Sequence, residues 1–253
     1  IVRWTNANGA QSLQLLRERL ERAYQATVLG RWSVQCRVYH ATSSSTTATV
    51  NDLTMNTATP TATATAAAAA AAPTPLYIVQ STAWPKQVHA VMSGRVVVSA
   101  GRELEAILVK LRALWTLRQT AVIEGMTYAM GDLLLRAGSI TVGQAHRGLV
   151  VELEYMACRT PGRCHAALKA LLAELLPSNA IWHTVEPDAL VATATTTAAT
   201  ATTVHVDEMD MDRYDTRTSP VPQWEALGLS STLCSSAHTA YQCARLLQQD
   251  RLL

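Results

Sequence analysis

The sequence predicts an α+β fold, in which a curled antiparallel β-sheet or open β-barrel of about seven to eight strands is flanked by helices. Three observations support this fold class. Several segments alternate apolar and polar residues, which is the period-two pattern of half-buried strands. Other segments repeat apolar residues every three or four positions, as amphipathic helices do. Along the chain a helix comes first, the strands follow with a single helix among them, and further helices close the sequence.

Four segments carry the helical pattern. The first ends just before Gly30, and glycine favours the position that follows a helix. Thr160 and Pro161 form an N-cap followed by a first-turn proline, so they are expected to begin the third helix. Helices are expected over residues 12–28, 101–115, 161–176 and 236–252.

The strand pattern is clearest where Trp32, Val34 and Cys36 alternate with polar residues. Ser93 and Gly94 form a two-residue connection of the kind that joins two strands in a tight hairpin. Strands are expected over residues 31–38, 76–80, 88–92, 95–99, 118–124, 126–130, 133–142 and 148–156.

The chain of 253 residues is expected to form a single domain, residues 1–253, that includes two tracts rich in Ala and Thr. Residues 42–75 are interpreted as a disordered loop insertion, because they offer too little apolar surface to offset the entropy of ordering. Residues 177–235 are expected to be irregular and contain the second tract, 192–203. No apolar run reaches the roughly 18–20 residues of a membrane span, and no signal peptide is expected.

The sequence contains no GxGxxG, Walker A, HExxH or GxSxG motif, and we predict no catalytic residue and no cofactor. The histidines are scattered, and the acidic run 207–215 lacks the glycine and glutamate of a calcium loop. Five cysteines without a CxxC pair argue against a disulfide scaffold or zinc module and favour a reducing intracellular compartment. We expect these cysteines to be buried small apolar residues. The net charge of +2 is too small to indicate nucleic-acid binding.

Glu152 and Glu154 form an acidic pair on one predicted strand. The period of two places both carboxylates on one face, about 6–7 Å apart. Inside a barrel, such a pair could hold a divalent ion and act on polyphosphate, as in triphosphate tunnel enzymes. That chemistry needs a second acidic strand, whereas Glu103 and Glu105 lie on a predicted helix. We therefore favour two glutamates on a solvated sheet face and keep the metal site as an alternative.

The run YAMGDLLLRAGSITVG, residues 128–143, followed by RGLVVELEY, residues 147–155, resembles subunit 20 of the Mediator complex, the TATA-binding-protein-related factor family. Supporting matches extend the resemblance over residues 3–41 and 76–176. It implies a barrel-like antiparallel sheet with helices in a nuclear, non-enzymatic scaffold subunit of the Mediator head module. It also implies a heterodimer with subunit 18, anchored through subunit 8, that acts as a coactivator of RNA polymerase II transcription.

Three functional hypotheses remain open from the sequence. The favoured one is a structural interaction module in which a partner covers an apolar face of the sheet. The second is a degenerate metal-dependent polyphosphate hydrolase that uses Glu152 and Glu154. The third is direct DNA binding, tested most simply at Arg17, Arg19 and Arg22. The sequence alone names no partner-binding residue.

Overall fold

The computed structural model describes residues 1–42, 74–92, 96–160, 163–185 and 224–253. The strands are β1 (Val2–Trp4), β2 (Thr27–Ala41), β3 (Leu76–Ser81), β4 (Val88–Met92), β5 (Val96–Ala100), β6 (Trp115–Met130), β7 (Leu133–Val142), β8 (Ala145–Tyr155) and β9 (Trp182–Thr184). The helices are α1 (Gly9–Tyr24), α2 (Glu103–Lys110), α3 (His165–Leu175), the short 3₁₀ helix η3 (Trp224–Leu227) and α4 (Ser236–Gln249).

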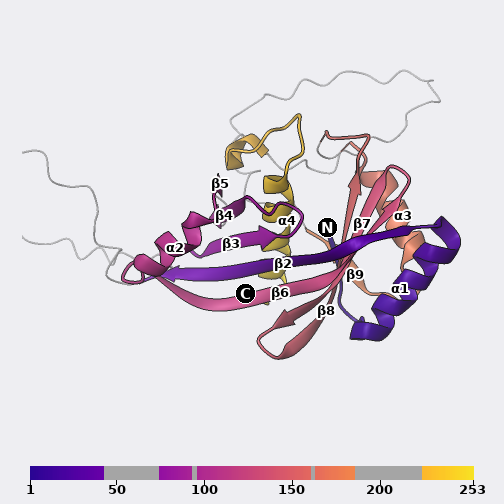
Figure 1. Cartoon of the computed structure of the whole chain (residues 1–253), viewed down its shortest axis with the longest axis horizontal. Coiled ribbons are helices and arrows are strands. Elements are labelled where there is room, and N and C mark those ends of the chain that lie inside the picture. Colours follow the sequence, from indigo (N-terminus) through magenta and orange to yellow (C-terminus); the bar gives the residue numbers. More distant parts are fainter. Residues whose placement is uncertain (43–73, 93–95, 161–162, 186–223) are drawn as a thin grey trace, which may run out of the picture.

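The described strands form one sheet in the order β5-β4-β3-β2-β6-β7-β8-β1-β9, and every neighbouring pair is antiparallel. Within the described part of the chain, β5 and β9 form the two edges and the sheet does not close. β2 and β6 pair over almost their whole length, from Thr27 opposite Ala129 to Ala41 opposite Trp115. Figure 1 shows this β2–β6 ribbon crossing the molecule, with α1 and α3 at one end and α2 at the other. The α+β class with a curled, open antiparallel sheet is therefore confirmed.

Helix α4 packs against one face of the sheet, which we call the inner face. Trp32, Val34 and Cys36 of β2 point to this face and are at most 3% exposed. Leu246 and Leu247 of α4 are fully buried in the same core. Burying a leucine side chain contributes roughly 1.5–3 kcal/mol, so α4 supplies a large part of the stability of this core.

The opposite face, which we call the outer face, is covered by the other helices. Leu16 and Leu20 of α1 and Leu172 of α3 pack over β1, β6, β7 and β8. Leu108 of α2 packs over β2, β3 and β4. Among the described residues, the chain's own helices pack against both faces of the sheet, and an apolar face covered by a partner stays a prediction.

Several element boundaries differ from the sequence prediction. The first helix ends at Tyr24, where Gln25 takes the left-handed conformation (φ 50°), and Gly30 lies within β2 instead of following the helix. The second helix ends at Lys110, because the segment from Trp115 onward pairs with β2. The third helix begins at His165 with Cys164 as its N-cap, not at Thr160.

The predicted strands 118–124 and 126–130 are one continuous strand, β6, and Gly125 lies inside it. A Cβ atom on Gly125 would lie 1.8 Å from the carbonyl oxygen of Ala137 on β7. Glycine thus permits a close approach of the two strands, rather than making a turn. The strands β1 and β9 were not predicted, since three residues are too few to show a period.

Other predicted features lie outside the described residues: positions 43–73 of the tract 42–75, the Ser93–Gly94 connection, Pro161, the tract 192–203 and the acidic run 207–215. The last helix was predicted over residues 236–252 and is observed as α4. A single domain over residues 1–253 stays a prediction. None of the described helices has the length and apolar character needed to cross a bilayer.

Candidate functional site

Glu152 and Glu154, the pair of the metal hypothesis, lie on β8 and both bind Arg136 of β7. Arg136 stands directly opposite Glu152 in the sheet register. Its Nη1 atom makes a short ion pair with Glu152 Oε1, and its Nη2 atom lies 2.9 Å from Glu154 Oε2. Glu152 is 5% exposed, whereas the side chain of Glu154 is 51% exposed. The arrangement links β7 to β8 on the inner face.

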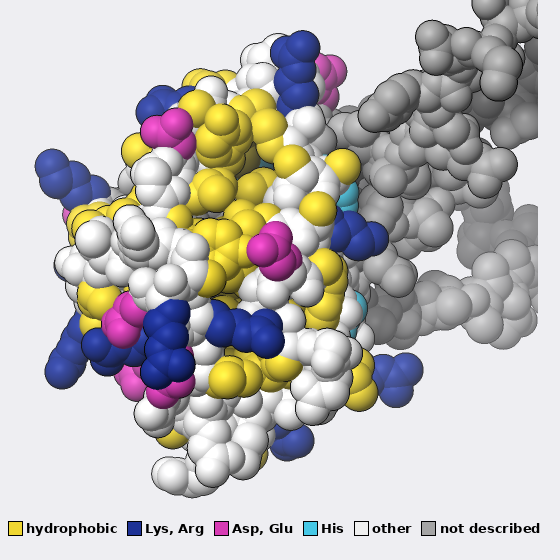
Figure 2. Space-filling model, turned by 90° about the vertical axis from the view of Figure 1, so that its right-hand side faces the viewer, with side chains coloured by type: hydrophobic (Ala, Val, Ile, Leu, Met, Phe, Trp, Pro, Cys, Tyr) yellow, Lys and Arg dark blue, Asp and Glu magenta, His cyan; other side chains and the backbone are white. Residues whose placement is uncertain are grey.

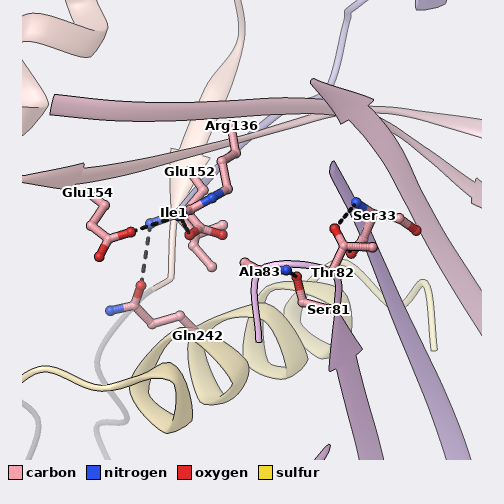
Figure 3. A network of polar contacts seen from close by, with 9 residues as sticks. All are labelled: Ile1, Ser33, Ser81, Thr82, Ala83, Arg136, Glu152, Glu154 and Gln242. Atoms are coloured by element: carbon pink, nitrogen blue, oxygen red, sulfur yellow. Dashed lines mark hydrogen bonds and ion pairs between the residues drawn. The ribbon is translucent and has the colours of Figure 1, made fainter. Parts of the chain in front are cut away.

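The expectation of a solvated sheet face is wrong for Glu152. Figure 3 shows Arg136 and Glu152 close to Ile1 and to Gln242 of α4, and the nitrogen of Ile1 lies 3.4 Å from Gln242 Oε1. This cover removes Glu152 from water, which raises the pKa of its carboxyl, while Arg136 opposes the rise by stabilising the carboxylate. The local pattern showed the face that Glu152 occupies but not the helix that covers it.

The two carboxylates act as partners of a guanidinium. A divalent ion between them would place a second positive charge beside Arg136, and the two cations would repel each other. Among the described residues, no group of three or more His, Cys, Asp or Glu side chains is placed to hold a metal ion. The geometry thus supports a structural role for Glu152 and Glu154.

The three arginines of the DNA-binding hypothesis also have partners within the chain. Arg17 Nε lies 2.7 Å from Glu21 Oε1, and Arg22 Nη2 lies 4.0 Å from Glu18 Oε2. Arg19 donates a hydrogen bond of 3.0 Å to the carbonyl oxygen of Leu175, at the end of α3. A cation at this end stabilises the helix dipole. The contact of Arg19 favours a structural role, whereas the ion pairs of Arg17 and Arg22 are exposed and contribute little to stability.

Exposed apolar side chains gather at the end of the sheet where β2 begins and β6 ends. Leu29 is 61% exposed, Met156 49% and Val28 42%. Val28 lies opposite Tyr128 of β6, whereas Leu134 lies opposite the next residue, Ala129, so the two side chains are near the same end of the sheet but on opposite faces. The Met156 N–H donates to the carbonyl oxygen of Asp132 in the β6–β7 turn (2.9 Å). We call Val28, Leu29, Leu134 and Met156 the sheet-end surface.

A β-bulge and a hollow distinguish this surface. The pairing of β2 with β6 shifts between Val28 and Gly30, so Leu29 is the extra residue. Such a bulge bends the strand and re-aims a side chain. Beside Leu29 lies a hollow of about 230 Å³, lined in part by Leu134 and Arg136. Gly30 leaves this space open, since no atom lies within 4 Å of the position a Cβ would take. The geometry suits a side chain of a second protein.

Hydrogen bonds hold one wall of the hollow in place (Figure 3). The Ser33 N–H donates to Thr82 Oγ1, and the Thr82 N–H donates to the Ser33 carbonyl oxygen, both at 2.9 Å. The Ala83 N–H donates to Ser81 Oγ at 3.1 Å. These bonds fix the β3–β4 turn against β2, so the hollow is formed before any partner arrives.

Figure 2 shows the side of the molecule that carries α1 and α3, where hydrophobic side chains form a broad surface bordered by Lys and Arg. A second exposed apolar group lies at the other end of the β2–β6 ribbon and consists of Ile107, Val109, Leu111, Leu114 and Leu117. The Thr42 N–H donates to Leu114 there (2.8 Å), and residues 43–73 join β2 to β3 at this end. We favour the sheet-end surface, because Leu29 there adjoins a hollow.

Two groups of residues differ from their sequence interpretation. Cys36 and Cys243 are buried as expected, but Cys158 and Cys164 are half-exposed and Cys234 is exposed. His89 and His238 are 1% exposed and support the start of α4. His89 Nε2 lies 3.0 Å from Ser236 Oγ, and His238 Nδ1 lies 3.1 Å from the Ser235 nitrogen. Each histidine is isolated in sequence, so spacing gave no signal of this role.

The family model for the TATA-binding related factor of subunit 20 of the Mediator complex matches residues 1–248. The chain belongs to this family. It is 26% identical over 172 residues to "Mediator of RNA polymerase II transcription subunit 20" of Xenopus laevis, covering 67% of this chain and 72% of the relative. The protein of the same name from Homo sapiens is 25% identical over 171 residues, with 67% and 71% covered. That of Aedes aegypti is 24% identical over 177 residues, with 69% and 70% covered.

Membership of the Mediator subunit 20 family confirms the resemblance seen in the sequence. The residues that carried it, 128–143 and 147–155, form the end of β6 and most of β7 and β8. They include Arg136, Glu152 and Glu154, whose contacts link strands. The segment that carried the resemblance therefore contains a buried ion pair of the sheet.

Proposed function

We propose that this chain is a non-enzymatic structural subunit of the Mediator head module in the nucleus. In this role it pairs with subunit 18, is anchored through subunit 8, and acts as a coactivator of RNA polymerase II transcription. The observation that carries the proposal is the family match over residues 1–248. The named relatives are subunits of the Mediator of RNA polymerase II transcription, and a subunit of a complex works through contacts with other chains.

The sheet-end surface is the contact that we propose for subunit 18. Leu29 projects from a bulge beside a preformed hollow, and Met156 and Val28 are exposed at the same end of the sheet. Interfaces concentrate their binding energy in a few central side chains that enter well-formed pockets. Burial of this surface, with no bond made or broken, would be the physical work of the subunit.

Co-expression of the full chain with subunit 18 from the same organism tests the pairing. We expect one complex of equal stoichiometry, measured by size-exclusion chromatography with light scattering, and a separate chain in the absence of subunit 18. A matched control replaces subunit 18 with a head subunit other than subunit 8, which should not form the same pair directly. A well-folded chain that elutes alone in the presence of folded subunit 18 would contradict the proposal.

A further inference from the structure

Helix α2 lies at the end of the β2–β6 ribbon that is opposite to α1 and α3 (Figure 1). It docks on the outer face through Leu108, which packs against Tyr39 of β2. Because Leu117 of β6 stands directly opposite Tyr39, its side chain projects from that same face. A turn joins the helix to β6, and in it the Leu114 N–H donates to the carbonyl oxygen of Leu111 (2.8 Å). The helix and the first residues of β6 therefore present side chains on one face of the sheet.

Several large apolar side chains of this region are exposed to water. Val109 is 69% exposed, more than any other large apolar side chain in the described part of the chain, and Leu117 is 48% exposed. Single exposed apolar side chains are ordinary, but five within eleven consecutive residues indicate a binding surface. We call this group the α2 surface, and it consists of Ile107, Val109, Leu111, Leu114 and Leu117.

The charge around the α2 surface is positive. Residues 106–123 contain Lys110, Arg112 and Arg118 but no acidic residue. All three cations are exposed, and they make no ion pair within the part of the chain that the structure describes. Arg118 is the extra residue where the pairing of β2 with β6 shifts, directly after Leu117. Exposed cations and exposed apolar side chains thus alternate along one segment.

The acidic residues near this surface do not balance these cations. Glu105 Oε1 lies 2.5 Å from Arg37 Nη1 of β2, so its charge is compensated within the chain, and Glu103 lies at the other end of α2. Helix α1 differs, because its exposed arginines have carboxylates beside them, as where Arg17 Nε lies 2.7 Å from Glu21 Oε1. The cations of the α2 surface therefore lack a counter-charge among the described residues.

We propose that the α2 surface binds an acidic amphipathic segment of another protein, in which carboxylates are interspersed with bulky apolar side chains. The apolar side chains of that segment cover the α2 surface, and its carboxylates lie beside Lys110, Arg112 and Arg118. A nucleic acid would pair with the cations but leave the apolar side chains in water. A neutral apolar partner would remove the cations from water without pairing them, which is costly. Charge and apolar exposure together therefore favour the acidic amphipathic segment.

This contact is separate from the one proposed for subunit 18. The sheet-end surface, with Leu29, lies where β2 begins, whereas the α2 surface, with Leu117, lies where β6 begins, at the other end of the ribbon. The proposal goes beyond the pairing with subunit 18 and does not depend on it, and both partners can bind the chain at once.

Fluorescence anisotropy with the full chain, in the absence of subunit 18, tests this site. The probe is a fluorescein-labelled synthetic peptide of about 15 residues, or about four helical turns, that combines aspartate with leucine and phenylalanine. We expect saturable binding that weakens between about 0.1 M and about 1 M salt, because the Debye length falls from about 10 Å to about 3 Å. One analogue has lysine in place of every aspartate, and a second has serine in place of every apolar residue. Each should bind at least about tenfold more weakly than the probe.

Substitutions then locate the binding surface. The double variant Arg112→Glu with Arg118→Glu should weaken peptide binding by at least about tenfold, because carboxylates would then face carboxylates. Leu117→Asp should weaken it by a similar factor. The matched controls are Arg22→Glu, at a side chain on α1 that is 82% exposed, and Leu29→Asp at the sheet-end surface. Both controls should bind the peptide like the unsubstituted chain.

Several results would overturn the site. These are no binding of the acidic peptide, equal binding of either analogue, or a greater loss in Arg22→Glu than in the double variant. Binding of a DNA duplex, or of vesicles made of equal parts of phosphatidylcholine and phosphatidylserine, at concentrations where the peptide does not bind would also overturn it. The three peptides are compared on the unsubstituted chain, so a folding defect in a variant does not obscure the answer. Peptide binding by a chain that fails to pair with subunit 18 would support this site while contradicting the proposed pairing.

Discussion

The inner face around Glu152 and the sheet-end surface around Leu29 lie on one sheet, and each contains a residue whose solvent exposure is unusual for its side chain. A carboxylate is 5% exposed at the first place, and a leucine is 61% exposed at the second. Arg136 and the covering helix α4 explain the buried charge, while a bulge in β2 explains the exposed leucine. The comparison separates residues that hold this chain together from residues that are available to another protein.

The largest expected loss in the free energy of unfolding comes from a substitution on the inner face. Glu152→Ala removes the carboxylate opposite Arg136 and leaves a largely buried guanidinium with a single, more exposed partner, Glu154. Breaking one side of a buried ion pair costs about 3–5 kcal/mol. Urea denaturation followed by circular dichroism should show this loss in the free energy of unfolding.

Glu154→Ala is the matched control, because its carboxylate binds the same guanidinium from a side chain that is 51% exposed. Exposed ion pairs contribute about 0–1 kcal/mol. Equal losses of unfolding free energy in the two variants would contradict the view that burial distinguishes these glutamates.

The close approach of β6 and β7 at Gly125 should be the next most sensitive feature. In Gly125→Ala the new Cβ would lie 1.8 Å from the Ala137 carbonyl oxygen, so β6 and β7 must move apart. We expect a loss of about 2 kcal/mol in the free energy of unfolding. Gly138→Ala is the comparison, since the nearest atom to its added Cβ lies 2.9 Å away. A smaller loss at Gly125 than at Gly138 would be inconsistent with this view of the strand contact.

Lowering the pH should destabilise the core on the inner face, because two buried histidines lie at the start of α4. Burial lowers the pKa of His89 and His238, so the unfolded chain binds protons near pH 6.5 while the folded chain does not. The free energy of unfolding therefore falls as pH drops below about 6.5. Tm values measured between pH 7 and pH 5 should decline less in His89→Gln than in the unsubstituted protein. The exposed His165 provides the control, and a reduced decline in His165→Gln instead would refute the assignment.

The smallest effect on stability is expected at the sheet-end surface. Leu29 has no cross-strand partner in the bulge and is 61% exposed, so Leu29→Asp removes little buried area. The free energy of unfolding should stay within about 0.5 kcal/mol of the unsubstituted value. A loss comparable to that of Glu152→Ala would mean that Leu29 belongs to the core of the chain.

Much of the fold was predictable because its signals are local. The alternation around Trp32 and Val34 and the apolar stripe through Leu16 and Leu20 placed the main strands and helices. Short or bent elements were not predictable in the same way. β1 and β9 are each three residues long, and Gly125 indicates a turn unless the pairing of β6 with β7 is known.

The candidate surface was harder to predict than the fold. Burial of Glu152 depends on α4, which lies more than 80 residues later in the chain, so local alternation indicated only which residues share its face. Gly30 was interpreted as the end of a helix, although it lies beside the bulge that exposes Leu29. A register shift depends on the partner strand, and the sequence of β2 alone does not reveal it.

The affinity of this chain for subunit 18 tests the central claim most directly, when Leu29→Asp is compared with Leu117→Asp. The two leucines lie on opposite ends of the β2–β6 ribbon and are 61% and 48% exposed. Isothermal titration calorimetry should show that Leu29→Asp weakens binding by about 30-fold, equivalent to about 2 kcal/mol, while Leu117→Asp binds like the unsubstituted chain. Unchanged binding by Leu29→Asp, or a greater loss in Leu117→Asp, would contradict the account.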